Sequence, residues 1–168
     1  MKIHRVAFLV ALLALGATLL PASAVADDAS LFASYNSHAE EGQQASAQYR
    51  RAVRRAKKSK NGATDAQLQA IIDADRKVNG VAAAVTSEVK GQQPSSTDGT
   101  KAKKYAVRGL LLFQKANNLE IASYEQLLAG KERASTATFR KSVQTIRRAA
   151  RAFIVAEKAF AKAGFKQQ

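Results

Sequence analysis

Basic side chains form two clusters in this chain, and they are the residues whose types and spacing most clearly imply chemistry. We predict eleven of them as anion-binding residues: Arg50, Arg51, Arg54, Arg55, Lys57, Lys58, Arg140, Lys141, Arg147, Arg148 and Arg151. Guanidinium and ammonium groups bind phosphates and carboxylates, and a field of one sign raises the rate of association with a polyanion. Contacts of this kind are sensitive to salt and show little selectivity.

A purely structural explanation competes with this prediction. Bases near the end of a helix interact favourably with the helix dipole, by about 0.3–1 kcal/mol each. Acidic residues expected at the same end of the molecule would neutralise part of the charge; these are Asp65, Asp73, Glu120, Glu125 and Glu132. The bases outnumber these acids, so the sequence still predicts a positively charged patch.

Two carboxylates, Asp75 and Glu157, fall on the apolar faces of predicted helices. A lone buried charge is costly and bases are plentiful, so we expect each acid either to pair with an Arg or Lys of a neighbouring helix or to lie at a wet edge of the core. Asp73 and Asp75 are two residues apart on a helix and point in different directions, which argues against a catalytic pair. We predict no catalytic residues.

Metal and cofactor sites are not expected either. The chain beyond its first 26 residues has one histidine, His38, and no cysteine or methionine. His38 with Glu40 and Glu41 is too incomplete a set for a zinc or di-iron site, and a haem would have at most one axial ligand. No Gly-x-Ser-x-Gly elbow and no phosphate-binding glycine loop occurs. We therefore predict a protein that is not an enzyme.

The first 26 residues have the pattern of a signal peptide. A short positive segment is followed by an apolar run at 6–20 and by small residues that allow cleavage near Ala24 or Ala26. The run is shorter than the ~20 residues of a membrane-spanning helix. Cleavage would remove Lys2 and Arg5 and no acid, which leaves a formal charge of +12 where the whole chain has +14. The remaining residues, 27–168, are expected to form a single domain.

A cleaved signal places the protein outside the cytoplasm, so we expect it to be secreted, or periplasmic and part of a bacterial cell envelope. The partners expected there are anionic envelope polymers, a lipid surface or another protein, with no span in the mature chain. Export from the cytoplasm and the lack of a helix-turn-helix pattern argue against sequence-specific binding of nucleic acid.

Apolar residues recur at steps of three and four, which predicts helices over about 30–58, 65–90, 101–128 and 133–164. Thr64 and Gln67 have the spacing of a capping box. The stretch 91–100 is predicted as the main loop, and Ser135 or Thr136 as the cap of the last helix. The turn signal Asn79-Gly80 lies inside the second helix, which we predict to be continuous because the apolar stripe keeps its phase.

The last helix is predicted to pack through a coiled-coil-like stripe of eight residues: Phe139, Val143, Ile146, Ala150, Phe153, Glu157, Phe160 and Gly164. Four long helices with short links predict an all-α protein, an antiparallel four-helix bundle in up-down-up-down order. The function expected is that of an exported bundle that binds an anionic partner through a basic pole. The alternative is an interaction module whose helix stripes pair with a second copy or with a partner chain.

Overall fold

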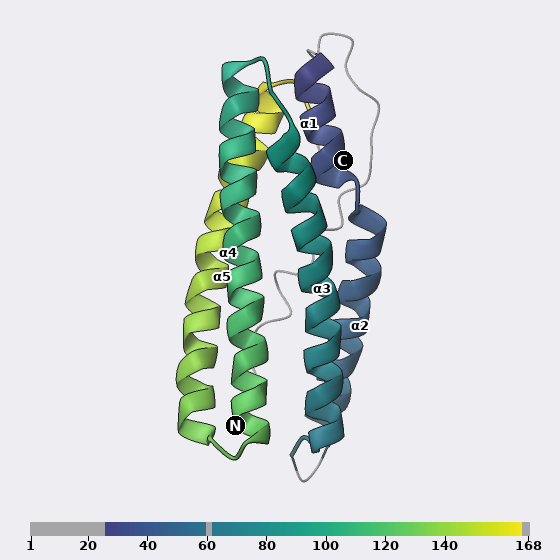
Figure 1. The fold of residues 1–168 in the computed structure, drawn as a ribbon, viewed down its shortest axis with the longest axis vertical. Helices are drawn as coiled ribbons and strands as arrows, with labels where there is room; N and C mark the ends of the chain where they lie inside the picture. Colours follow the sequence, from purple (N-terminus) through teal and green to yellow (C-terminus); the bar gives the residue numbers. More distant parts are fainter. Residues whose placement is uncertain (1–25, 60–61, 166–168) are drawn as a thin grey trace.

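The computed structural model describes residues 26–59 and 62–165, so the predicted signal peptide lies outside the described residues. The described residues form five helices and no strands, in the arrangement of an elongated helical bundle (Figure 1). They are α1 (Ala26–Asn36), α2 (Ala39–Lys58), α3 (Asp65–Gly91), α4 (Thr97–Leu128) and α5 (Glu132–Lys162). The prediction of an all-α helical bundle is confirmed.

The predicted first helix over 30–58 is two helices, α1 and α2, separated at Ser37 and His38. Local hydrogen bonds account for the break. The Asn36 side chain donates to the backbone carbonyl of Phe32 at 2.9 Å, and the Ser37 hydroxyl donates to that of Ser34 at 2.9 Å. Side chains of this kind satisfy backbone groups that would otherwise continue the helical ladder. As a result, α1 packs on α3 and α4 near one end of the bundle, while α2 packs along α3.

Helix α3 passes through Asn79-Gly80 without a break, as the apolar stripe predicts. The capping box is present: the Gln67 amide donates to the Thr64 hydroxyl at 3.3 Å, and the Thr64 amide donates to the Gln67 side chain at 3.0 Å. The Asn79 side chain does not form a turn, because it donates a hydrogen bond to the Asn118 side chain of α4 at 2.9 Å. The apolar face of α3 therefore outweighs the local turn signal.

Helix α4 begins at Thr97, four residues before the predicted start. Ser96 caps it, because its hydroxyl accepts a hydrogen bond from the Gly99 amide at 2.8 Å. The buried carboxylate of Asp28 on α1 accepts from the Ser95 amide at 3.1 Å, from the Ser96 amide at 3.3 Å and from the Ser96 hydroxyl. The start of α4 is thus attached to α1, and the loop is shorter than the sequence predicts.

Helices α4 and α5 pack most closely of all the helix pairs. On each of them small buried residues recur every seven positions, at Gly109, Ala116 and Ser123 on α4 and at Ser135, Ser142 and Ala149 on α5. The Ser123 hydroxyl donates to the Ser135 carbonyl at 3.0 Å, and the Ser142 hydroxyl donates to the Ala116 carbonyl at 2.9 Å. Side chains this small let the two backbones approach closely enough for hydroxyl-to-carbonyl bonds.

Two predictions about α5 are wrong. Only two of the eight residues of the predicted stripe, Phe153 and Phe160, are buried, and most of the other buried residues of α5 are small. Ser135 does not cap the helix, because it is buried within α5 and bonded to Ser123, and the helix begins one residue after Lys131. The sequence pattern weights large apolar residues, whereas close packing against α4 requires small ones.

Candidate anion-binding surface

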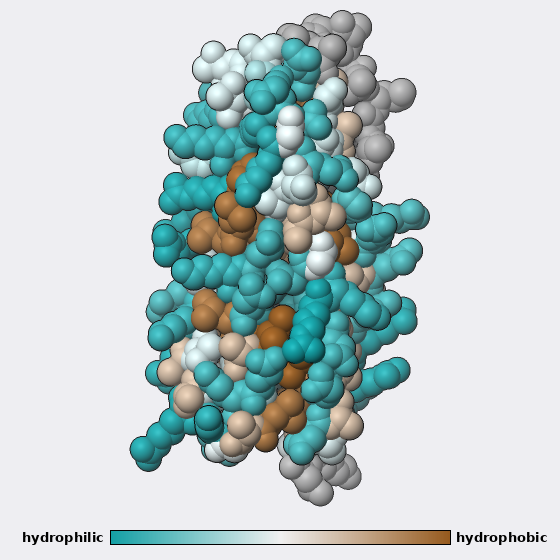
Figure 2. All heavy atoms as spheres, viewed as in Figure 1, coloured by the Kyte–Doolittle hydropathy of each residue, from teal (hydrophilic) through white to brown (hydrophobic). Residues whose placement is uncertain are grey.

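Ten of the eleven predicted anion-binding residues are exposed, and Arg50 is partly buried. They belong to α2 and α5, whose buried faces are made mainly of small and aromatic residues, so the charged side chains can only point outward. Figure 2 shows one face of the molecule, on which hydrophilic side chains cover most of the surface and hydrophobic atoms show in separate patches.

None of these eleven bases has a carboxylate within 4 Å among the described residues. The acids that could neutralise them are engaged elsewhere or lie apart: Arg76 on α3 takes Glu125 at 3.0 Å and Asp73 at 3.7 Å. Arg50 and Arg54 are four residues apart on one helix, as are Arg51 and Arg55, and like charges at this spacing repel. These two like-charge pairs each oppose helix stability by about 0.2–0.5 kcal/mol unless a counter-ion covers them.

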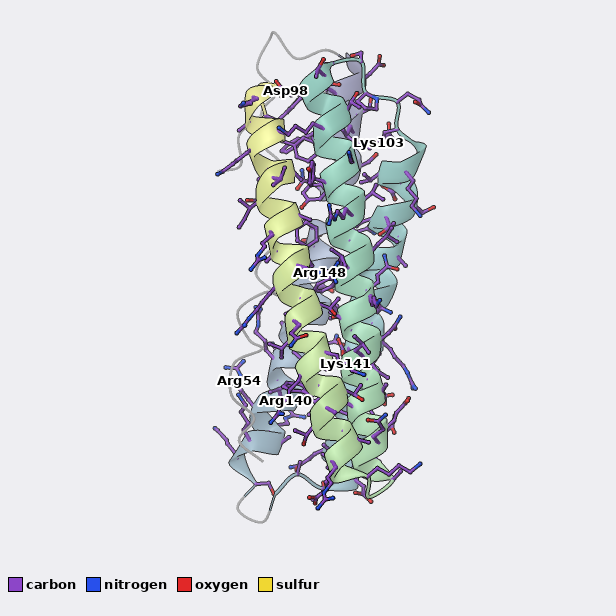
Figure 3. All side chains as sticks on the ribbon, turned by 90° about the vertical axis from the view of Figure 1, so that its left-hand side faces the viewer. Arg54, Asp98, Lys103, Arg140, Lys141 and Arg148 are labelled. Atoms are coloured by element: carbon purple, nitrogen blue, oxygen red, sulfur yellow. The ribbon has the colours of Figure 1, made fainter. Side chains whose placement is uncertain are left out.

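Figure 3 shows how the two basic clusters are distributed along the bundle. Arg54 of α2 and Arg140 and Lys141 of α5 lie in the lower half of that view. Arg148 lies about midway along the molecule. The expectation that Arg148 shares the pole of α2 is thus not met, since α5 carries its bases along much of its length.

A groove of about 580 Å³ lies between α2 and α3. Arg51 and Arg55 line it from α2, and Lys77 and Asp73 line it from α3. The Lys77 ammonium donates to the Gln48 side chain at 3.2 Å, which joins the two walls of the groove. Alanines make up most of the remaining lining: Ala52, Ala66, Ala70 and Ala74. The groove thus brings together three cations and one carboxylate from two helices.

Lys77 is a residue that the sequence reasoning missed. It lies in the middle of α3, far in sequence from either basic cluster, and only the packing of α2 on α3 brings it beside Arg51. The one available signal was its position four residues after Asp73, on the polar face of a long helix. That signal does not say which neighbouring helix the side chain meets.

The buried acids form a separate cluster inside the bundle. Glu120 on α4 was expected to be a surface acid, but it is buried; Asp75 was expected to meet a base or a wet edge, but it is buried and faces Glu120. Tyr49 of α2 donates to Glu120 at 2.5 Å, and Tyr124 donates to the same oxygen at 3.3 Å. No Arg or Lys pairs with either acid among the described residues. Phenols, and not bases, donate to Glu120.

Burial, followed by the nearby charge of Glu120, raises the pKa of Asp75 to about 9. Burial also raises the pKa of Glu120, although the hydrogen bonds from Tyr49 and Tyr124 oppose that shift. Asp75 therefore holds a proton at neutral pH. One of its oxygens, Oδ2, has no hydrogen-bond partner, and the same is true of Ser46 Oγ and Asn117 Nδ2 in the same core. Neither Asp75 nor Glu120 lines the groove described above.

Glu157, the other acid predicted on the apolar face of a helix, is partly buried on α5, and desolvation raises its pKa. Tyr35 on α1 lies close enough for the charge of Glu157 to add to burial in raising the pKa of the phenol. Phe160 packs against Tyr35 with ring centroids 5.3 Å apart. Glu157 thus lies at the margin of an aromatic cluster, which is the wet-edge position expected of it.

His38 lies at the break between α1 and α2 and bridges two carboxylates. Its Nδ1 is 2.8 Å from Glu41 of α2, and its Nε2 is 2.8 Å from Glu88 of α3. The hydrogen bonds to Glu41 and Glu88 raise the pKa of the imidazole. The described residues contain no group of three or more His, Cys, Asp or Glu side chains placed to hold a metal ion.

Among the described helices, none combines the length and the apolar content needed to cross a bilayer. Comparison with models of known protein families, with characterised proteins and with solved structures finds no match to this chain. The function is therefore argued from the residues of the chain itself.

Proposed function

We propose that this protein is an exported, non-enzymatic four-helix bundle that binds an anionic partner through the basic surface of α2 and α5. The carrying observation is that eleven bases crowd two helices and none of them has an acidic partner among the described residues. Unneutralised charge of one sign attracts polyanions over a distance of about 10 Å at moderate salt. A bacterial cell envelope contains polyanions of this kind, such as phosphate-bearing polymers and anionic lipids.

The proposal includes the up-down-up-down order of the bundle, with α1 and α2 together forming the first arm. Three cross-helix contacts support it: Gln48 with Lys77, Asn79 with Asn118, and Ala116 with Ser142. The proposal also includes cleavage of a signal peptide near Ala24 or Ala26, on the residue pattern at 1–26. Export would bring the basic surface into contact with envelope polyanions.

Co-sedimentation with lipid vesicles tests this function. We expect the purified protein to pellet with vesicles that contain an anionic phospholipid and to stay in solution with vesicles of neutral phospholipid alone. Raising the salt concentration should release it, because counter-ions compete for the bases. Equal binding to both kinds of vesicle would show that the attraction is not electrostatic.

A second candidate function is self-association or pairing with a partner chain. The observation in its favour is that Leu111 on α4 and Ile154 on α5 are large apolar side chains with 45 % and 48 % of their surface exposed. Single exposed apolar residues are common on monomers, so this surface is weaker support than the basic one. Light scattering distinguishes the two, because a strict monomer would exclude self-association through these residues.

A further inference from the structure

The groove between α2 and α3 has a more specific character than the rest of the basic surface. We infer that it binds a single, extended phosphodiester chain, with one phosphate at each of Arg51, Arg55 and Lys77. This inference rests on the proposed function and identifies the class of anion within it. Three features of the groove carry it: the spacing of its cations, its alanine strip, and its position between two packed helices.

The spacing of the cations along the groove fits a repeating phosphodiester. Arg51 and Arg55 are four residues apart on α2, which is a separation of about 6 Å along the helix axis. Lys77 faces this row from α3, and its ammonium lies 3.2 Å from the side chain of Gln48, a residue almost one helical turn before Arg51 on α2. An extended covalent chain covers about 3.5 Å in three bonds, so phosphates joined through six bonds recur at about 7 Å. Flexible Arg and Lys side chains absorb the small difference.

The wall formed by α3 explains why a diester chain fits better than a string of bare phosphates. Besides Lys77 it carries Ala66, Ala70 and Ala74, with Asp73 as its one acid. Alanine methyl groups offer apolar contact to the carbon units between phosphates. The Asp73 carboxylate would repel a phosphate but accepts a hydrogen bond from a hydroxyl, as it does from the Gln69 amide at 2.9 Å. A chain that alternates phosphates with hydroxylated carbon units matches both walls.

The position of the groove between two packed helices favours a single chain. The axes of neighbouring helices are typically about 8–10 Å apart when packed. A nucleic-acid duplex, whose major groove alone is about 12 Å wide, cannot enter such a groove and would touch only its rim. A flat vesicle surface likewise meets the exposed Arg and Lys side chains of the rim without reaching the alanines.

The test uses a short fluorescent oligothymidylate as a single-stranded phosphodiester, with binding followed by anisotropy at several salt concentrations. For single strands the logarithm of the binding constant falls by about 0.7 per phosphate contact for each tenfold rise in salt. The variant Arg51→Gln/Arg55→Gln/Lys77→Gln should therefore lose about 2 from this slope. The matched variant Arg140→Gln/Lys141→Gln/Arg147→Gln removes the same charge from α5 and should lose less than half as much.

Two additional measurements make the result specific to the groove. Lys77→Arg keeps the charge and should keep the slope, and a duplex of the same sequence should bind less tightly than the single strand. Equal losses of slope in the two triple variants, or equal affinity for duplex and single strand, would overturn the assignment to the groove. If heparin retains the protein but oligothymidylate does not bind, this inference fails and the proposed function stands. If neither polyanion binds, both fail.

Discussion

The phenol of Tyr49 on α2 donates a hydrogen bond of 2.5 Å to the buried carboxyl group of Glu120 on α4. This bond joins α2 to α4 through two residues that are 71 positions apart in the chain. Asp75 of α3 is also buried and close enough to Glu120 for the charge of that group to raise its pKa, so three helices contribute to a polar cluster that contains no base. The stability of this cluster depends on the phenol that donates to Glu120 and on the proton held by Asp75.

Tyr49→Phe is expected to destabilise the fold. The substitution keeps the aromatic ring but removes the donor of the shorter of the two hydrogen bonds to Glu120, and leaves the 3.3 Å bond from Tyr124. Losing a hydrogen bond to a buried acidic group costs about 1.5–3 kcal/mol. Urea unfolding should show the loss. Tyr105→Phe, at a partly buried tyrosine of α4 outside this cluster, is the control and should change stability by less than about 0.5 kcal/mol.

Asp75→Asn is expected to stabilise the protein at alkaline pH. Asp75 has a pKa of about 9 in the folded state and an ordinary value of 3.8, so the folded state binds more protons between these values. The contribution of Asp75 to the free energy of unfolding therefore falls as pH rises from about 4 to 9. An amide needs no proton, so the variant should lose this dependence. Thermal unfolding between pH 5 and 9 measures it; an unchanged pH profile would mean that Asp75 is ionised in the fold.

The close contact of α4 and α5 should be sensitive to one methyl group. A Cβ at Gly109 would lie 2.6 Å from the Phe153 ring, whereas a Cβ at Gly80, in the middle of α3, would meet nothing within 4 Å. We expect Gly109→Ala to destabilise by about 1–3 kcal/mol through overpacking. Gly80→Ala should stabilise by about 0.5–1 kcal/mol, because alanine is the better helix former. If both variants stabilise alike, the two helices are not in close contact at Gly109.

His38 should make the junction of α1 and α2 sensitive to pH. Its pKa is raised above the ordinary value of 6.5 by hydrogen bonds to Glu41 and Glu88. The stability that it contributes is fully present below pH 6.5 and is lost as pH rises through the folded-state pKa. Relative to the intrinsic, base-catalysed exchange rate at each pH, the protection of the amides of residues 36–42 should therefore fall as pH rises above 6.5. His38→Gln should abolish this step, and a step that survives in the variant would assign the effect to another group.

Local features of this fold could be predicted from the sequence, and features that depend on helix register could not. The capping box at Thr64 and the continuity of α3 follow from residues within one helix, and both agree with the structure. The break at Ser37 depends on side-chain bonds that a hydrophobic pattern does not include. The burial of Glu120 depends on Tyr49, and the place of Lys77 in the groove depends on Arg51, each supplied by a different helix.

The candidate anion-binding surface likewise has one property that the sequence predicts and one that depends on how the helices pack. Exposure of ten basic residues follows from the amphipathic pattern of α2 and α5, because a charged face opposite an apolar one must point to solvent. Their lack of acidic partners does not follow from composition, since the chain holds 13 acids. Asp73 lies beside Arg76 because the two are three residues apart in α3, whereas Glu125 reaches Arg76 only through the packing of α3 on α4.

Elution from immobilised heparin tests the central claim most directly. The variant Arg54→Gln/Arg55→Gln/Arg147→Gln/Arg148→Gln removes four exposed bases of the proposed surface, and Lys90→Gln/Lys101→Gln/Lys104→Gln/Lys115→Gln removes four exposed bases of α3 and α4. We predict that the native protein is retained at moderate salt. The first variant should elute at clearly lower salt than the second, although both carry the same net charge. Elution of the two variants at the same salt would contradict a binding surface on α2 and α5.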